Sequence, residues 1–300
     1  MNRLMKSNNI LINSFTNTKH EDMFIDLIEK IKNNSDKSLN DSWLKTGDAG
    51  IYLYNTGYNL DRHANTSAFG EISWGIKNIN GKLEWEMYFY RQVTDIKKSM
   101  SIIKEIFPNL PTSLPESTER QVDMWSININ DLSPKEINLY SCTSHPNEKV
   151  FSAAKTFAYD GTNYKYQNDY LSWLTANRQD YVASDLQAIK EEILPSPFIN
   201  NNQSEIHNTI DMDNILLPEF LKATAITTCT KKDCESIYYQ ALEIDLLIIF
   251  LKKFNYPQKQ IDFLENNKKK LSHLVYCVSF DYKIENNKFK ILKSGYYGQL

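Results

Sequence analysis

The chain repeats one structural unit: an amphipathic helix followed by two strands of alternating polarity, with a short polar turn between the strands. The first pair of strands is the clearest, because residues 71–77 and 83–90 alternate on either side of Asn80 and Gly81. Asn-Gly is the strongest short signal for a β-hairpin. Four further hairpins are predicted, with strands at 122–129 and 136–140, 150–159 and 162–166, 220–228 and 235–239, and 274–282 and 288–297.

Five hairpins supply about ten antiparallel strands, which rarely stay flat and open because twist and unpaired edges favour closure. Helices are expected near 21–33, 94–107, 181–193, 240–254 and 258–269. The sequence therefore predicts an α/β fold of the α+β type: an antiparallel ten-stranded β-barrel of repeated αββα units with helices outside. A single domain over residues 1–300 is expected, with residues 1–19 as a poorly ordered N-terminal extension.

Charge and cysteine content narrow the function classes. The net charge is −3, from 34 Lys and Arg against 37 Asp and Glu, so no global attraction to nucleic acid or to an anionic membrane is expected. The four cysteines, the lack of a leader segment and the lack of a run of about 20 apolar residues indicate a cytoplasmic protein. A monomer that binds small molecules is the expected state.

Cys229 and Cys234 are the one pair with spacing that resembles a metal site. Zinc would need further ligands, and only His207 and His273 lie at all near in sequence. Ordinary buried or turn thiols are the favoured interpretation, and no metal site is predicted.

The strands of the first hairpin separate an apolar face from a polar one. The polar face carries Lys77, Glu84, Glu86, Tyr88 and Tyr90. Two interpretations remain open, because a sheet that faces solvent and a barrel that encloses a lumen share the same period of two. Tyrosines among carboxylates favour enclosure mildly.

The last strand adds a charge and a phenol on one side. Lys293, Gly295 and Tyr297 share a face because side chains alternate with a period of two. This spacing places a cation and a hydroxyl on either side of an open space. It suits the binding of an anionic, partly apolar ligand.

Three segments resemble a known family. The segments 274–278 (L-V-Y-C-V) and 293–297 (K-S-G-Y-Y) resemble the final hairpin of the soluble aromatic prenyltransferases with the αββα, or ABBA, barrel. The segment 137–140 (I-N-L-Y) looks like another strand of that family. The number and spacing of hairpins agree from residue 65 onward.

The resemblance implies transfer of an allylic group, dimethylallyl or geranyl, from its diphosphate to an aromatic acceptor such as a phenol, an indole or a peptide side chain. It implies that Lys293 and Tyr297 engage the donor, and that Asn138 and Tyr140 contribute to the site. Fixed cations stabilise the leaving diphosphate and tyrosine rings shield the carbocation. Glu86, or a water, is the candidate acceptor for the proton that leaves the ring.

The chain departs from the family at one position. An arginine is expected on the strand 235–239, where this sequence has E-S-I-Y-Y. Lys222, Lys155 and Arg91 are the candidate replacements, and Tyr239 completes the predicted substrate-binding set. Convergence of the basic residues in one cavity would favour the transferase.

The alternative is a non-catalytic barrel protein that binds a small aromatic or lipid ligand, or a module for protein interaction. The aspartate-rich pattern of helical prenyl synthases, the P-loop and the G-x-G-x-x-G motif are all absent from the sequence. No cofactor is indicated, apart from Mg²⁺ as a companion of the diphosphate.

Overall fold

The structure is a computed structural model that describes ten segments of the chain. They are residues 72–90, 104–105, 124–130, 133–143, 150–159, 164–174, 183–193, 215–272, 274–285 and 288–299. The N-terminal extension, the helix predicted at 21–33 and most of the helix predicted at 94–107 lie outside the described residues.

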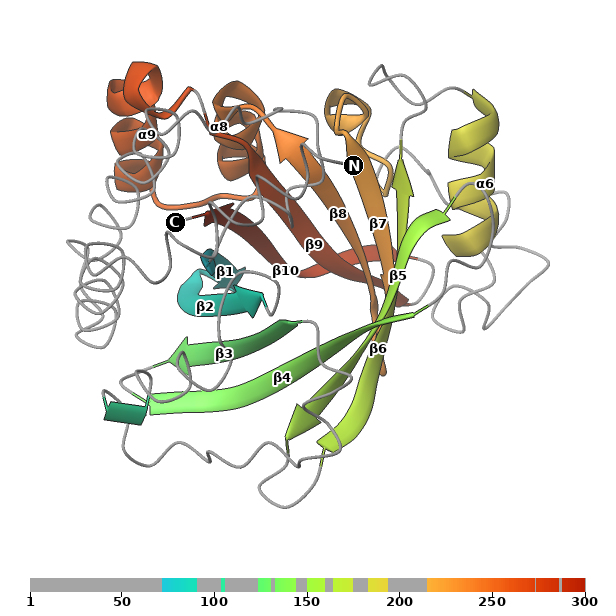
Figure 1. The fold of residues 1–300 in the computed structure, drawn as a ribbon. Coiled ribbons are helices and arrows are strands. Elements are labelled where there is room, and N and C mark those ends of the chain that lie inside the picture. Colours follow the sequence, from blue (N-terminus) through green and yellow to red (C-terminus); the bar gives the residue numbers. More distant parts are fainter. Residues whose placement is uncertain are drawn as a thin grey trace, which may run out of the picture.

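Ten strands are described, and they pair in the order of the sequence (Figure 1). They are β1 Ile72–Ile79, β2 Lys82–Tyr90, β3 Met124–Asn130, β4 Ser133–Thr143, β5 Val150–Tyr159, β6 Tyr164–Leu174, β7 Ala225–Thr230, β8 Glu235–Leu242, β9 Tyr276–Glu285 and β10 Lys288–Gln299. Every pairing is antiparallel, and β1 also pairs with β10, which closes the order of strands into a barrel.

Helices accompany the strands in the described segments. They are α6 Ala183–Ile193, α8 Ile244–Lys253, α9 Gln258–Leu271 and the short 3-10 helix η3 Pro218–Phe220. In Figure 1, α8 and α9 lie together beside β8, β9 and β10, and α6 stands apart. The contacts agree, because α8 touches both α9 and β9 whereas α6 touches β7.

The turn between β1 and β2 shows why the sequence forms a hairpin there. Asn80 and Gly81 have φ angles of 52° and 87°. A two-residue hairpin turn that matches the twist of its strands needs positive φ at both positions, which Asn and Gly tolerate best. The side chain of Asn78 accepts a hydrogen bond of 2.8 Å from the backbone N–H of Gly81.

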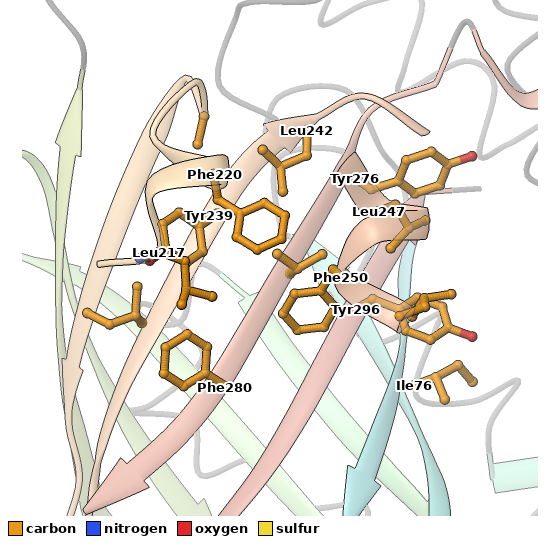
Figure 2. Packing of buried hydrophobic residues seen from close by; sticks show 14 of the residues in the cluster. Ile76, Leu217, Phe220, Tyr239, Leu242, Leu247, Phe250, Tyr276, Phe280 and Tyr296 are labelled. Carbon is orange, nitrogen blue, oxygen red and sulfur yellow. The ribbon is translucent and has the colours of Figure 1, made fainter. Parts of the chain in front are cut away.

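The main core lies between the helices and one face of the sheet (Figure 2). Phe250 of α8 lies 4.3 Å from Phe254 and 5.8 Å from Phe220, measured between ring centroids. Phe254 in turn stacks on Phe280 of β9 at 5.4 Å. Each buried side chain of this size contributes about 1.5–3 kcal/mol, so this contact fixes which face of β9 meets the helices.

The prediction of an antiparallel, β-rich α+β fold is confirmed, and the five hairpins appear where the alternation placed them. The repetition of αββα units is seen only in part, because helices are described for part of the chain. Strand β7 begins at Ala225 rather than at Phe220, because Phe220 belongs to η3 and packs against Tyr239 at 5.4 Å. Among the described residues no helix is long and apolar enough to cross a membrane.

Candidate functional site inside the barrel

Contacts with the helices show which face of each strand points out of the barrel and which points into it. Tyr296 and Phe280 lie on the face that meets the helices, so their chain neighbours Tyr297 and Asp281 lie on the other face, which is the interior of the barrel. Residues that are paired across neighbouring strands lie on the same face, so the register extends this assignment from strand to strand around the barrel. Residues of this interior face include Lys77, Glu84, Glu86, Tyr88, Ser126, Asn128, Asn138, Tyr170, Ser236, Tyr238, Ser279, Asp281, Lys293 and Tyr297.

The lysine–aspartate cluster, formed by Lys231, Ser236, Asp281 and Lys293, is the main charged group on this face. Register places Lys293, Asp281 and Ser236 side by side on β10, β9 and β8. Lys231 reaches both oxygens of Asp281 from the β7–β8 turn at 2.8 Å, and Ser236 donates to Oδ1 at 2.6 Å. The Nζ of Lys293 lies 3.2 Å from Oδ2.

The cluster sets the protonation of its carboxyl group. Burial raises the pKa of Asp281, but the charges of Lys231 and Lys293 and the hydrogen bonds from Lys231 and Ser236 outweigh it and lower that pKa to about 2. The pKa of Lys231 is raised, because Asp281 offsets the cost of burying the ammonium group. Asp281 and Lys231 are therefore both charged at neutral pH.

Lys293 is held differently from Lys231. Burial, followed by repulsion from Lys231 and Lys77, lowers the pKa of its ammonium group in spite of Asp281 and Glu86. Its side chain is 29% exposed, against 14% for Lys231. Lys293 is thus the more weakly held of the two lysines and the more accessible.

A second ion pair lies on β1 and β2. The Nζ of Lys77 is 2.7 Å from Oε2 of Glu86, and Lys77 also donates to the side-chain oxygen of Asn128 at 3.4 Å. Glu86 is only 1% exposed. This carboxylate therefore neutralises a lysine in the folded protein.

A row of tyrosines crosses the interior face. Tyr88, Tyr297, Tyr238 and Tyr170 follow one another at ring-centroid distances of 5.7, 6.2 and 5.9 Å. They come from β2, β10, β8 and β6, which are not direct neighbours, so their rings meet across the intervening strands. Burial raises the pKa of Tyr238 and of Tyr297, which keeps both phenols protonated at neutral pH.

Tyr297 depends on two glycines. A Cβ atom on Gly75 would lie 2.4 Å from its ring, and one on Gly295 would lie 2.8 Å from its hydroxyl oxygen. The hydroxyl group is 3.3 Å from the Oγ of Ser279. Small residues on β1 and β10 therefore let the ring lie flat against the barrel wall.

Two buried polar groups next to the tyrosine row have no hydrogen-bond partner within the segments that the structure describes. They are the Oγ of Ser126 and the Oδ1 of Asn138, which lie opposite each other on β3 and β4. Buried polar groups are normally paired. These two add unused hydrogen-bonding capacity to the interior face.

The structure brings together some of the residues that the sequence singled out. Lys293, Tyr297, Glu86 and Asn138 all lie on the interior face. Arg91 and the side chain of Tyr140 lie outside the described residues.

Three predicted residues lie away from that face. Lys155 is exposed, and its Nζ lies 3.9 Å from Oδ1 of Asp169 and 5.8 Å from the ring centroid of Tyr166. Lys222 is exposed in the turn before β7. Tyr239 is on the helix side, where its hydroxyl donates to the carbonyl of Ile215 and accepts from the N–H of Leu217. The structure therefore does not bring Lys155 and Lys222 together with Lys293, because alternation turns Lys155 outward and Lys222 precedes the strand.

Sequence reasoning missed the partners of Lys293. Asp281 alternates with the apolar Phe280 and Tyr282, and it lies two residues from Ser279. This pattern could have placed Asp281 on the polar face of its strand. Lys231 gave none, because it belongs to a polar turn whose side chains have no periodic direction.

Comparison with known proteins gives a match to part of a curated protein. No family model matches the chain. Over 260 residues the chain is 26% identical to the "Putative JmjC domain-containing protein L887" of Acanthamoeba polyphaga mimivirus. The match covers 74% of this chain and 41% of that protein, so the chain spans less than half the length of the curated relative.

This finding corrects the functional prediction. The resemblance to aromatic prenyltransferases is wrong, and with it the predicted prenyl transfer, the transferase class and a role in secondary metabolism, because the relative carries the name of a different class. The alternative of a non-catalytic carrier of aromatic or lipid ligands gains no support either. The K-S-G-Y-Y segment has a local explanation: Lys293 pairs with Asp281, and Gly295 makes room for Tyr297.

Proposed function

We propose that the chain binds a small acidic molecule through Lys293 on the interior face of the barrel. One observation carries the proposal: Lys231 and Ser236 already occupy both oxygens of Asp281, which reaches Lys293 only at 3.2 Å. Among Lys77, Lys231 and Lys293, the lysines described on or beside this face, Lys293 therefore has the longest ion pair.

The charges that act on Lys293 favour an anionic ligand. The charged groups that act on Lys293 are Lys77, Lys231, Asp281 and Glu86. Together with Lys293 they comprise three positive and two negative charges. An acid group beside Lys293 would neutralise the remaining positive charge, and a buried charge is costly unless it is paired.

The rest of the interior face fits such a ligand. The hydroxyl group of Tyr297 and the unpartnered oxygens of Ser126 and Asn138 supply further hydrogen bonds. The proposal assumes that the strands form the ten-stranded αββα barrel that the sequence predicts. It takes the partner to be a small molecule rather than nucleic acid or a membrane, and the protein to be a monomer.

The name of the relative suggests a second candidate, an oxygenase, since JmjC proteins typically use Fe(II) and 2-oxoglutarate. Such iron sites are built from two histidines and a carboxylate. Within the described segments there is no histidine and no group of three residues suited to a metal. Of the interior carboxylates, Glu86 and Asp281 are each paired with lysine, and no described histidine accompanies them, so the described interior does not fit iron.

The strand order also differs from that candidate. JmjC domains are cupin-type β-sandwiches, in which two sheets are joined by Greek-key connections. Here each described strand pairs with the next in sequence around one ring. Because 41% of the relative is matched, its name alone does not assign a JmjC domain to this segment.

The test is calorimetric titration of the protein with succinate, 2-oxoglutarate and inorganic phosphate at constant ionic strength. We expect saturable binding of at least one of them. Replacing Lys293 by Met should weaken that binding by about tenfold to a hundredfold, because a charge-assisted hydrogen bond contributes about 1.5–3 kcal/mol.

Lys290→Met is the matched control. Lys290 lies on the same strand, but its side chain is 57% exposed and it pairs with Glu285. Its replacement should leave the affinity unchanged. Equal loss in both variants, or no saturable binding of any of the three anions to the wild-type protein, would overturn the proposal.

A further inference from the structure

Lys293 has the surroundings of a nucleophilic amine as well as those of an anion-binding group. Two ammonium groups share Asp281, and Lys231 holds both of its oxygens at 2.8 Å. Ser236 donates to the same carboxylate, so little of its hydrogen-bonding capacity remains for Lys293. A lysine becomes a nucleophile when desolvation and a neighbouring cation favour its neutral form.

The three lysines differ in how closely each is paired with a carboxylate. Lys77 is committed to Glu86 at 2.7 Å and Lys231 to Asp281 at 2.8 Å. Both lie near enough to repel the charge of Lys293. The side chain of Lys293 is also 29% exposed, which is more than the 13% of Lys77 and the 14% of Lys231.

We propose that Lys293 forms a Schiff base with the carbonyl group of an acidic ligand, which makes the ligand an oxo acid. This inference rests on the proposed function, because the acid group is what draws the ligand to the lysine–aspartate cluster. It adds the chemical class of the ligand and a covalent role for Lys293.

The reaction balances without a further reactant. Lys293 first passes a proton to water, and its nitrogen lone pair then forms a bond to the carbonyl carbon while the carbonyl π pair moves to oxygen. The oxygen takes up protons and leaves as water, and a protonated imine remains. Overall, an ammonium ion and a carbonyl compound give an iminium ion and water, so the positive charge next to Asp281 is kept.

The hydroxyl group of Tyr297 is suited to contact the ligand. Tyr297 lies on the same face four residues beyond Lys293, its hydroxyl oxygen is 3.3 Å from the Oγ of Ser279, and burial raises its pKa. The phenol therefore stays protonated and remains a hydrogen-bond donor at neutral pH.

Trapping with sodium borohydride tests the proposal. The full chain is incubated separately with glyoxylate, pyruvate and 2-oxoglutarate, reduced, and measured by intact mass and peptide mapping. We expect a single reduced adduct with at least one oxo acid, on the peptide that contains Lys293. Lactate, which has no ketone, should give none.

Lys293→Arg separates charge from nucleophilicity. Arginine keeps the positive charge but does not form an imine, so adduct formation should fall by more than about tenfold while succinate binding is kept. Lys290→Arg, an exposed lysine on the same strand, should retain the adduct. Lys293→Met, checked for folding by circular dichroism, should lose the adduct as well.

The outcomes distinguish the two proposals. An adduct spread over exposed lysines, an adduct that survives in Lys293→Arg, or no adduct with any of the three oxo acids overturns the Schiff base. If succinate binding still depends on Lys293 in that case, the proposed function stands. If the wild-type protein binds none of the titrated anions, both proposals are overturned.

Discussion

Asp281 joins three strands and a turn through one carboxylate. It accepts from Lys231 of the β7–β8 turn and Ser236 of β8, and it lies 3.2 Å from Lys293 of β10. A buried carboxylate of this kind stabilises mainly by preventing its partners from being left charged and alone. The lysines would be costly to bury without it.

Removing this charge should therefore destabilise the protein strongly. Asp281→Asn leaves two lysines without a carboxylate, and we expect a loss of about 3–5 kcal/mol in the free energy of unfolding at neutral pH. Urea denaturation followed by circular dichroism measures it. Glu285→Gln, which alters an exposed carboxylate that also pairs with two lysines, is the control and should leave the midpoint unchanged. Equal midpoints for the two variants would contradict this role of Asp281.

At the scale of elements, the β1–β2 hairpin depends on its turn. Gly81 has a φ of 87°, yet nothing lies within 4 Å of the position where a Cβ atom would stand. The constraint at this position is therefore the backbone conformation and not a lack of space. This separates it from Gly75, where the ring of Tyr297 occupies that position.

Replacing Gly81 by Ala should cost about 1–2 kcal/mol in the free energy of unfolding, because residues with a Cβ atom resist positive φ. Gly81→Asn should cost less, since asparagine tolerates that region of φ better. Thermal and urea unfolding of the two variants give the comparison. An alanine variant as stable as the wild type would show that the turn relaxes to negative φ at no cost.

At the scale of the whole molecule, stability should depend on pH through Asp281. Its pKa is about 2 in the folded protein and about 3.9 in an unfolded chain. The stabilisation it provides is complete above the unfolded pKa and is lost as the pH falls from about 4 to about 2. It amounts to about 2–3 kcal/mol.

The difference in unfolding free energy between the wild type and Asp281→Asn isolates this group from other carboxylates. We expect that difference to shrink by about 2–3 kcal/mol as the pH falls through this window. Urea denaturation over a series of pH values measures it. A difference that stays constant would mean that Lys231 and Lys293 do not lower the pKa of Asp281.

Much of the fold was predictable because its signals are local. The alternation around Asn80 and Gly81 located the first hairpin, and the same pattern located the other four. The site was predictable only in part. Lys293, Tyr297 and Glu86 were singled out and lie on one face, but the structure does not bring Lys155 and Lys222 to it. A period of two shows that faces alternate without showing which face is inside, and Lys222 precedes its strand.

The sequence by itself determined where the strands lie, which side chains share a face, and that a cation and a phenol end the last strand. The tertiary structure decided what they meet. Lys231 and Asp281 are 50 residues apart and Lys77 comes from the opposite end of the described chain, yet strand pairing and barrel closure bring them near Lys293. Hydrogen-bonded strand neighbours and the packing of α8 against β9 select the interior face, and these long-range contacts leave no periodic pattern in the sequence.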